Sequence, residues 1–392
     1  MMTGGGFLKH GPLGLVSVLW AVVNVILFSS KGVKIVDDSA RYIEYANGLS
    51  SGFYFDSHNF WYIGYAIYLL IIFKVFSGSM IAVVVGQYVL SLVAVLALYR
   101  TAFLLWSSII SALATCVLFL AFIDISLWNS YILTESLYTS FTCFSLYFLV
   151  KCYKQGSNVV LASIAVVVTF FIKPTGIAIL VAVMSVLIYN TLRNVSSIFV
   201  RGLILLGVSL VLIALVNRMI TTYLILENYQ LGEIIYGVRA YHGEYPVSAL
   251  MIDPPGDLYI PDQAQQPVIR VLSFVVHNPI YWTKLFALKV FYLLSHTRPF
   301  WSVIHNLFSV TILLPSYFLF FKSLRSANEK TVIVFSIAFL LVHILSVGIT
   351  SEDWDGRFLV PMLPVLFIIA PRSLQRTPID IRNGESPAGD SR

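Results

Sequence analysis

The sequence predicts an all-α membrane protein, a polytopic bundle of about ten spans whose outer loops carry surface-lying helices. Of its 392 residues, 58% are hydrophobic and only 11% are charged, whereas a soluble domain has about 25% charged residues. Most of the surface therefore does not face water. The net charge of +6 is not a nucleic-acid signal, because basic residues in a membrane protein mark the cytoplasmic side.

Ten apolar runs are long enough to approach the roughly 20 residues that a spanning helix needs. They are 11–30, 79–99, 101–122, 135–152, 157–173, 175–191, 198–216, 300–321, 331–349 and 357–371. The three cysteines, Cys116, Cys143 and Cys152, lie in or beside these runs without metal-site spacing, so we interpret them as apolar packing residues.

An eleventh apolar run, 60–76, decides the orientation of everything after it. If it lies on the outer surface and the N-terminus is inside, short cytoplasmic segments hold 13 Lys and Arg residues and short outer segments hold six. If it spans, this bias reverses. Because Lys and Arg favour the cytoplasm, we predict an interfacial or re-entrant helix, with Trp61, Tyr62, Tyr65 and Tyr68 at the membrane surface.

This topology defines one body, residues 1–371, with outer loops at 31–78 and 217–299, and a cytoplasmic, disordered tail at 372–392. Both termini are expected in the cytoplasm. All but four of the 19 Asp and Glu residues then face outward. The outer face is therefore where titratable side chains could carry chemistry.

The first outer loop contains adjacent acids, Asp37 and Asp38, followed by Arg41 and Tyr42 on a short amphipathic helix. One of the acids could simply cap that helix. Two of them at the edge of a membrane core exceed what a cap requires, and a carboxylate there could act as a general base toward a hydroxyl. His58 stands just before the aromatic run.

Two further outer positions carry charge. Glu135 begins the fourth run, where it could carry a functional role or only complement the positive end of a helix capped by Thr134. Asp124, at the end of the preceding run, is a weaker candidate. Lys173, in the turn before Pro174, could attract a lipid phosphate or simply extend along the bilayer edge.

The last outer segment runs from Ser351 into an Arg-aromatic-apolar sequence with two prolines. Arg357 could hold a phosphate through two parallel hydrogen bonds, or it could pair with Asp353 or Asp355. These two acids and Glu352 could bind a divalent cation, although nothing in their spacing defines such a site. No cofactor is otherwise indicated, and no metal site is predicted.

The order of these motifs resembles the GT-C membrane glycosyltransferases, in particular the polyprenyl-phosphate-dependent group that includes protein O-mannosyltransferases and the lipid-A aminoarabinose transferase. The resemblance rests on the acids after the first span, the aromatic helix, the acid at Glu135, the lysine-proline turn and the closing Arg357 segment. It implies that Asp37 or Asp38 is the base, that Glu135 is the second acid, and that the remaining candidates bind substrate. Those substrate-binding candidates are Lys173, Arg357, His58, Tyr42, Asp353 and Asp355.

The expected function is transfer of a sugar, with inversion, from a polyprenyl-phosphate donor to a glycan, lipid or protein acceptor on the extracytoplasmic face. The expected location is a bacterial inner membrane. A flippase for lipid-linked glycans and an O-antigen-type polymerase are the alternatives. Transporters tend to place charges within their spans and to show paired halves, whereas here the charges gather at the outer ends. Tyr241, His242 and Glu244, in the long loop, could contact an acceptor sugar.

Overall fold

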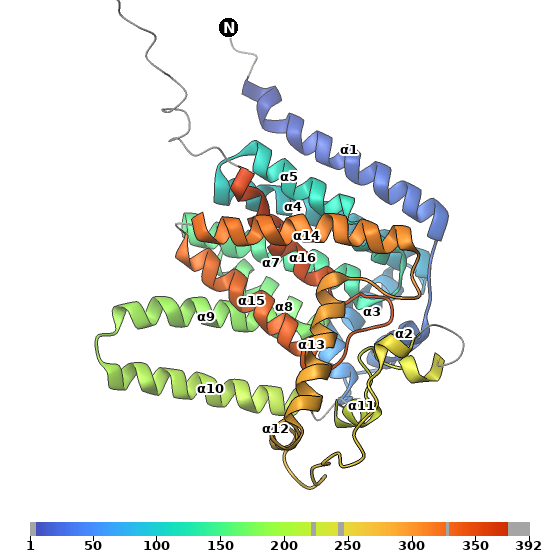
Figure 1. Ribbon diagram of the computed structural model, residues 1–392. Helices are drawn as coiled ribbons and strands as arrows, with labels where there is room; N and C mark the ends of the chain where they lie inside the picture. The colour runs from blue at the N-terminus through green and yellow to red at the C-terminus, as the bar shows by residue number, and fades with distance from the viewer. Residues whose placement is uncertain (1–4, 221–224, 242–246, 327–328, 375–392) are drawn as a thin grey trace, which may run out of the picture.

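The computed structural model describes residues 5–220, 225–241, 247–326 and 329–374, and within them it is helical (Figure 1). The described residues form isolated β-bridges but no strand, so the all-α prediction is confirmed. The helices are α1 (Gly5–Lys31), α2 (Asp37–Leu49), α3 (Ile63–Val75), α4 (Met80–Trp106), α5 (Ile109–Ala121), α6 (Ile123–Leu127), α7 (Thr134–Gln155), α8 (Val159–Ile172), α9 (Ile177–Asn194), α10 (Ile198–Ile220), α11 (Ile225–Leu231), α12 (Pro267–His277), α13 (Pro279–Ser295), α14 (Val303–Ser326), α15 (Lys330–Ile349) and α16 (Leu363–Ile369).

Among the described residues, six helices are long and apolar enough to cross a membrane, with mean hydropathies between 1.6 and 2.7: α1, α4, α9, α10, α14 and α15. A seventh candidate is α5 followed by α6, which are bent by 65° relative to one another. The other predicted positions hold α7, which is 22 residues long but more polar, and the shorter α8 and α16. The protein is therefore polytopic, and the count of ten spans stays a prediction.

The predicted position of the turn between the second and third spans, at Arg100, is wrong. Arg100 lies inside α4, which continues to Trp106. The chain reverses at Ser107, whose φ of 51° is left-handed, and Ser108 caps α5 by accepting a hydrogen bond from the Ser111 amide. The apolar run is nearly continuous here, so the capping serines, and not the lone arginine, decide where the helix ends.

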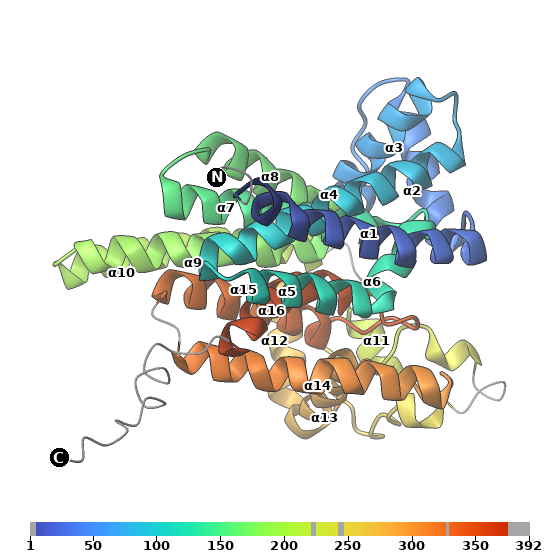
Figure 2. The same ribbon diagram turned by 90° about the horizontal axis from the view of Figure 1, so that it is seen from above.

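Figures 1 and 2 show that α1 begins, and the last described residues after α16 lie, at one end of the bundle, while α2, α3 and α11 lie at the other. Hydrogen bonds hold the first of these ends together. Trp106, at the end of α4, donates to the Ile368 carbonyl, and Ser111 of α5 donates to the Pro371 carbonyl. We call the opposite end, where α2 and α3 lie, the site end.

At the site end, α3 packs against α2, α4 and α8. With the preceding turn, α3 makes a 17-residue apolar helix, 59–75. This is shorter than the roughly 20 residues of a typical span. It is still within the range of about 17 to 25 residues found for spans, so whether 60–76 crosses the membrane or lies at its surface stays a prediction.

The long loop 217–299 contains more helices and a larger buried core than the sequence indicates. A second apolar core, separate from that of the bundle, includes Tyr229, Leu250 and Phe274. Near the end of the loop lies α13, which packs against α15. Its Lys289 side chain is buried and donates to the Thr350 carbonyl at 2.5 Å. The loop therefore contacts the segment that leads to Arg357.

Candidate functional site

Asp38 enters the site from the first turn of α2. Neither aspartate caps this helix: Val36 holds the cap position, and its amide donates to Ser39 Oγ at 3.0 Å. Asp37 and Asp38 therefore fall in the first turn, where their charge complements the positive end of the helix. Asp37 is exposed, whereas Asp38 accepts hydrogen bonds from two arginines.

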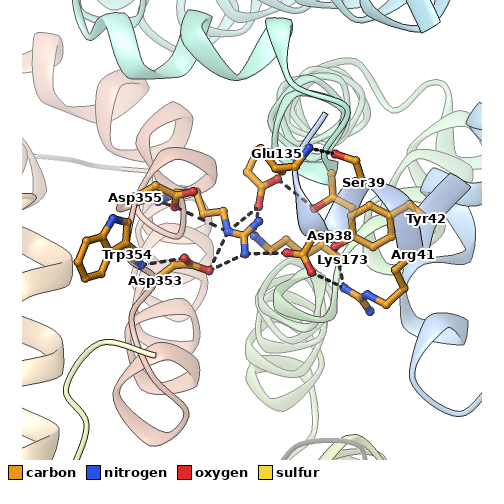
Figure 3. A network of polar contacts seen from close by, with 12 residues as sticks. Asp38, Ser39, Arg41, Tyr42, Glu135, Lys173, Asp353, Trp354 and Asp355 are labelled. Carbon is orange, nitrogen blue, oxygen red and sulfur yellow. Dashed lines mark hydrogen bonds and ion pairs between the residues drawn. The ribbon is translucent and has the colours of Figure 1, made fainter. Parts of the chain in front are cut away.

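Arg357 lies among carboxylates from three separate parts of the chain. Figure 3 shows those carboxylates, Asp38, Glu135, Asp353 and Asp355, gathered around one point. Its Nη2 donates to Asp38 at 2.8 Å and to Asp353 at 2.6 Å, and its Nε donates to Asp353 at 2.8 Å. The same Nε lies 3.7 Å from both Glu135 and Asp355. Arg357 therefore pairs with the acids on its own loop, as one interpretation expected, and it also joins that loop to α2.

Glu135 and Lys173 form a nearly enclosed ion pair beside Arg357. Lys173 Nζ lies 2.5 Å from Glu135 Oε1, and the two side chains are 5% and 1% exposed. Glu135 also accepts a hydrogen bond from Thr134 Oγ1. The helix α7 is not capped by Thr134, because its cap position is Leu133 and Thr134 is its first residue. Lys173 points inward over the ring of Phe358, not along the bilayer edge.

Arg41 adds a third cation, which the sequence places in the right motif without assigning it a role. Its guanidinium donates to Asp38, to Asn59 and to the hydroxyl of Tyr42. It also lies over the rings of Tyr42 and Tyr62 at 4.7 and 4.9 Å. The His58 ring stacks on Tyr62. The sequence candidates Tyr42 and His58 therefore line the Arg41 side of the site.

These charges set the ionisation of Asp38. Partial burial opposes its negative charge, but Arg357 and then Arg41 outweigh that effect and lower the pKa of Asp38 below its usual value. The carboxylate is therefore ionised at neutral pH but is a weak base while both arginines are bound to it. A ligand that drew the arginines away would raise its pKa.

Buried polar side chains from other elements bind the loop that leads to Arg357. Arg298, 1% exposed, donates to the Asp353 carbonyl at 2.9 Å and lies 3.2 Å from the Glu352 carboxylate. His343, in α15, is hydrogen-bonded to the Phe358 carbonyl at 2.7 Å. These contacts position Asp353 and Arg357 before any ligand arrives.

The site brings three cations, Arg357, Arg41 and Lys173, together with the four carboxylates of Asp38, Glu135, Asp353 and Asp355. The two guanidiniums, of Arg357 and Arg41, are groups suited to bind a phosphate. The guanidinium of Arg357 occupies the centre of the acid cluster that could have held a divalent cation. Of the long-loop candidates, the side chain of Tyr241 and all of His242 and Glu244 lie outside the described residues.

The sequence interpretation missed a second polar cluster. Asp124, singled out only weakly, accepts hydrogen bonds from His296 and His305, which come from the other end of the sequence. No spacing pattern could have joined them, because 172 and 181 residues separate the histidines from Asp124.

Among comparisons with known proteins, neither a protein-family model nor a curated protein sequence matches the chain. Solved structures do match. The crystal structure of ArnT from Cupriavidus metallidurans bound to undecaprenyl phosphate aligns with a TM-score of 0.50 and 15% identity over 95% of this chain. ArnT in the apo state aligns with a TM-score of 0.48 and 14% identity. The chain spans 62% and 61% of the length of those two chains. The helical architecture and the likeness to the first of these structures together show that the chain shares the membrane-protein fold of ArnT.

Proposed function

We propose that the protein is an integral membrane glycosyltransferase that transfers a sugar from a polyprenyl-phosphate donor to an acceptor hydroxyl on the extracytoplasmic face. The observation that carries the proposal is the placement of Asp38 between Arg357 and Arg41, beside Lys173, at one end of a membrane bundle. ArnT, whose fold the chain shares, was crystallised with undecaprenyl phosphate. A lipid-linked donor also fits a site on the outer face, where cytosolic nucleotide sugars are absent.

The cations bind the donor in this proposal. Arg357 is the central ligand of the phosphate, because its guanidinium can make two parallel hydrogen bonds to phosphate oxygens. Arg41 binds a second oxygen, and Tyr42 and Tyr62 hold its guanidinium in place. Lys173 stays paired with Glu135 and so offsets the negative charge of that carboxylate behind the phosphate. The polyprenyl chain extends into the lipid between the spans.

Asp38 is the base. It takes the proton of the acceptor hydroxyl as the oxygen forms a bond to the anomeric carbon. The bond from that carbon to the phosphate oxygen breaks, and its electron pair leaves with the polyprenyl phosphate. Attack from the side opposite the leaving group inverts the configuration at that carbon. Arg357 and Arg41 stabilise the added charge on the departing phosphate.

Donor binding also activates the base. In the free protein, Arg357 and Arg41 hold Asp38 at 2.8 and 3.1 Å and lower its pKa. A donor phosphate competes for the same N–H groups. As the arginines turn toward it, the pKa of Asp38 rises, and the carboxylate becomes a better proton acceptor when the sugar is in place. This coupling limits proton abstraction to the loaded site.

The proposed location is the inner membrane of a bacterium, with both termini in the cytoplasm and the site end outside. The proposed partners are the lipid-linked donor, the surrounding membrane lipid and an acceptor, which is a glycan, a lipid or a protein. Nucleic acid is not among them. Glu135 supports the site by holding Lys173, while Asp353 accepts hydrogen bonds from the side chain of Arg357 and Asp355 accepts one from its backbone amide.

The test uses the purified full chain in detergent or nanodiscs with radiolabelled polyprenyl-phosphate sugars and candidate acceptors. Asp38→Asn is expected to abolish transfer, with a loss of about 100-fold or more, because general base catalysis contributes roughly that much. Asp37→Asn is the matched control, since it removes the adjacent exposed carboxylate, and it should keep most of the activity.

Three outcomes would contradict the proposal. Equal activity of wild type and Asp38→Asn would reject Asp38 as the base. Loss of activity in Asp37→Asn alone would assign that role to the neighbouring residue. Movement of a lipid-linked sugar across vesicles without turnover of any donor would favour a flippase.

A further inference from the structure

A second cluster, Asp124, His296 and His305, lies outside the set of residues proposed to bind donor and acceptor. Asp124 Oδ2 is 2.8 Å from His296 Nε2 and 3.0 Å from His305 Nε2. The three possible ligand atoms all lie within 4.8 Å of one another. Two imidazole nitrogens therefore point at a single carboxylate oxygen.

Three separate elements build this cluster. Asp124 comes from the short helix α6, next to the 65° bend. His296 follows α13 in a left-handed conformation, with φ of 48°, and His305 lies in the first turn of α14. A left-handed conformation is uncommon for a residue other than glycine, and here it turns the His296 ring toward Asp124.

We propose that Asp124, His296 and His305 bind a divalent transition-metal ion, with zinc as the best match. Two imidazoles and one carboxylate are the ligands of many zinc and other transition-metal sites. Calcium and magnesium prefer oxygen ligands throughout. Ligands about 2.1 Å from zinc in tetrahedral geometry stand roughly 3.4 Å apart, so each ring nitrogen needs to move about half an ångström away from the Asp124 oxygen.

The surroundings favour a fixed site with limited access. The Trp301 ring stacks on His305 at 4.4 Å between centroids, and Trp301 and Phe122 also contact the His296 ring. The side chain of His296 is 1% exposed, while that of His305 is 33% exposed. An ion could therefore enter along His305, and the aromatic rings would hold both imidazoles in orientation.

The cluster also touches the loop that carries Arg357. A Cβ placed on Gly356, whose φ is +72°, would lie 2.6 Å from His296 Cε1 and 2.9 Å from Trp301. The backbone next to Arg357 therefore packs directly on a ligand ring. A bound ion would fix α6 and the start of α14 against this loop, and would act on the proposed donor site through position, without contacting the donor.

The experiment uses the full chain, purified through a tag without histidines and stripped with a chelator. Zinc uptake is measured by calorimetric titration and by elemental analysis after removal of free ion. We expect about one zinc per chain for wild type. Asp124→Asn and His305→Ala each remove one ligand and should weaken binding by about tenfold or more, since even changes outside the ligand shell cost about 10–100-fold.

His277→Ala is the matched control. His277 lies at the end of α12, is exposed and stacks on Tyr259, so its loss should leave zinc uptake unchanged. Monodisperse elution and helical circular dichroism identify the variants that fold, and His305→Gln replaces any that do not. Zinc should also raise the thermal midpoint of wild type but not that of His305→Ala.

The proposal is overturned if wild type takes up no zinc at micromolar concentration, or if the folded ligand variants bind it as tightly as wild type. Magnesium that displaces the zinc would also contradict the assigned ligand class. None of these measurements uses a sugar donor. The zinc site can therefore fail while the transferase proposal stands, and the reverse also holds.

Discussion

Glu135 and Lys173 form an ion pair almost wholly removed from solvent, with Arg357 Nε 3.7 Å from the same carboxylate. Taking either charge out of water is costly, and each is tolerated because the other is present. Loss of one partner would leave a buried charge without its counter-ion. This pair should therefore matter for stability.

We predict that Glu135→Gln and Lys173→Met each lower the free energy of unfolding by about 3–5 kcal/mol, the usual cost of breaking a buried pair. The double variant should cost less than the sum, because neither charge is then left alone. Urea unfolding in detergent micelles measures all three. The control is Glu329→Gln, which breaks an exposed pair with Lys154 and should cost no more than about 1 kcal/mol. Strictly additive losses would show that the pair is not energetically coupled.

At the residue scale, the sequence indicates which charged residues face outward but not how they pair. Asp37 and Asp38 look alike in the sequence, and only the packing of α2 against the Arg357 loop separates them. Arg41 stands within the quoted motif, yet its contact with Asp38 depends on a helical turn and on Asn59 from the following loop. Asp124 and its two histidines carry no local signal at all.

At the scale of elements, buried polar side chains fix where α7 begins. Asn129, 2% exposed, donates to Asn24 of α1 and Ser91 of α4 and accepts from Ser136 of α7. Gln87 of α4 donates to the carbonyls on either side of Ser130. Among apolar spans such bonds hold helices in one register, and here that register sets the height of Glu135.

Asn129→Ala should lower both stability and transfer. A bond of this kind between membrane helices contributes about 0.6 kcal/mol on average and up to about 1.7, so losing three should cost roughly 2–5 kcal/mol. Activity should fall as well, since Glu135 begins the helix that Asn129 anchors. Asn194→Ala, at the exposed end of α9, is the control and should change stability by less than about 0.5 kcal/mol. Full activity in a destabilised Asn129→Ala would separate this network from the site.

The lengths of the apolar runs predicted most of the helices, but not the residues at which those helices begin and end. The run from 79 to 122 contains one charge, Arg100, and the sequence interpretation put the turn there. The structure turns at Ser107 and Ser108, because side-chain capping satisfies the first amides of α5. The polar helix α7 shows the opposite problem: its Ser and Thr residues lower its hydropathy, yet many are buried against neighbouring helices.

At the scale of the whole molecule, the topology chosen from the Lys and Arg count predicted that four distant segments lie at one end of the bundle. It put residues after α1, before α7, after α8 and after α15 on the same face, and Asp38, Glu135, Lys173 and Arg357 do meet there. No residue-level pattern links these four, which lie on segments up to 319 residues apart. Topology alone therefore predicted that they converge, and packing supplied the contacts.

The side of the membrane that the site faces can be tested with single cysteines. Cys116, Cys143 and Cys152 are first replaced by alanine, and Ser51→Cys or Gln155→Cys is then introduced. Ser51 is exposed between α2 and α3 at the site end, whereas Gln155 is exposed at the far end of α7, roughly 33 Å along that helix from Thr134. If the site end faces outward, a membrane-impermeant maleimide will label Ser51→Cys in intact cells and Gln155→Cys only after permeabilisation. The reverse pattern would place the site in the cytoplasm, where nucleotide sugars are present and a lipid-linked donor is not required. Labelling of both in intact cells would mean that α7 does not cross the bilayer, which would break the topology on which the convergence of the four charged residues depends.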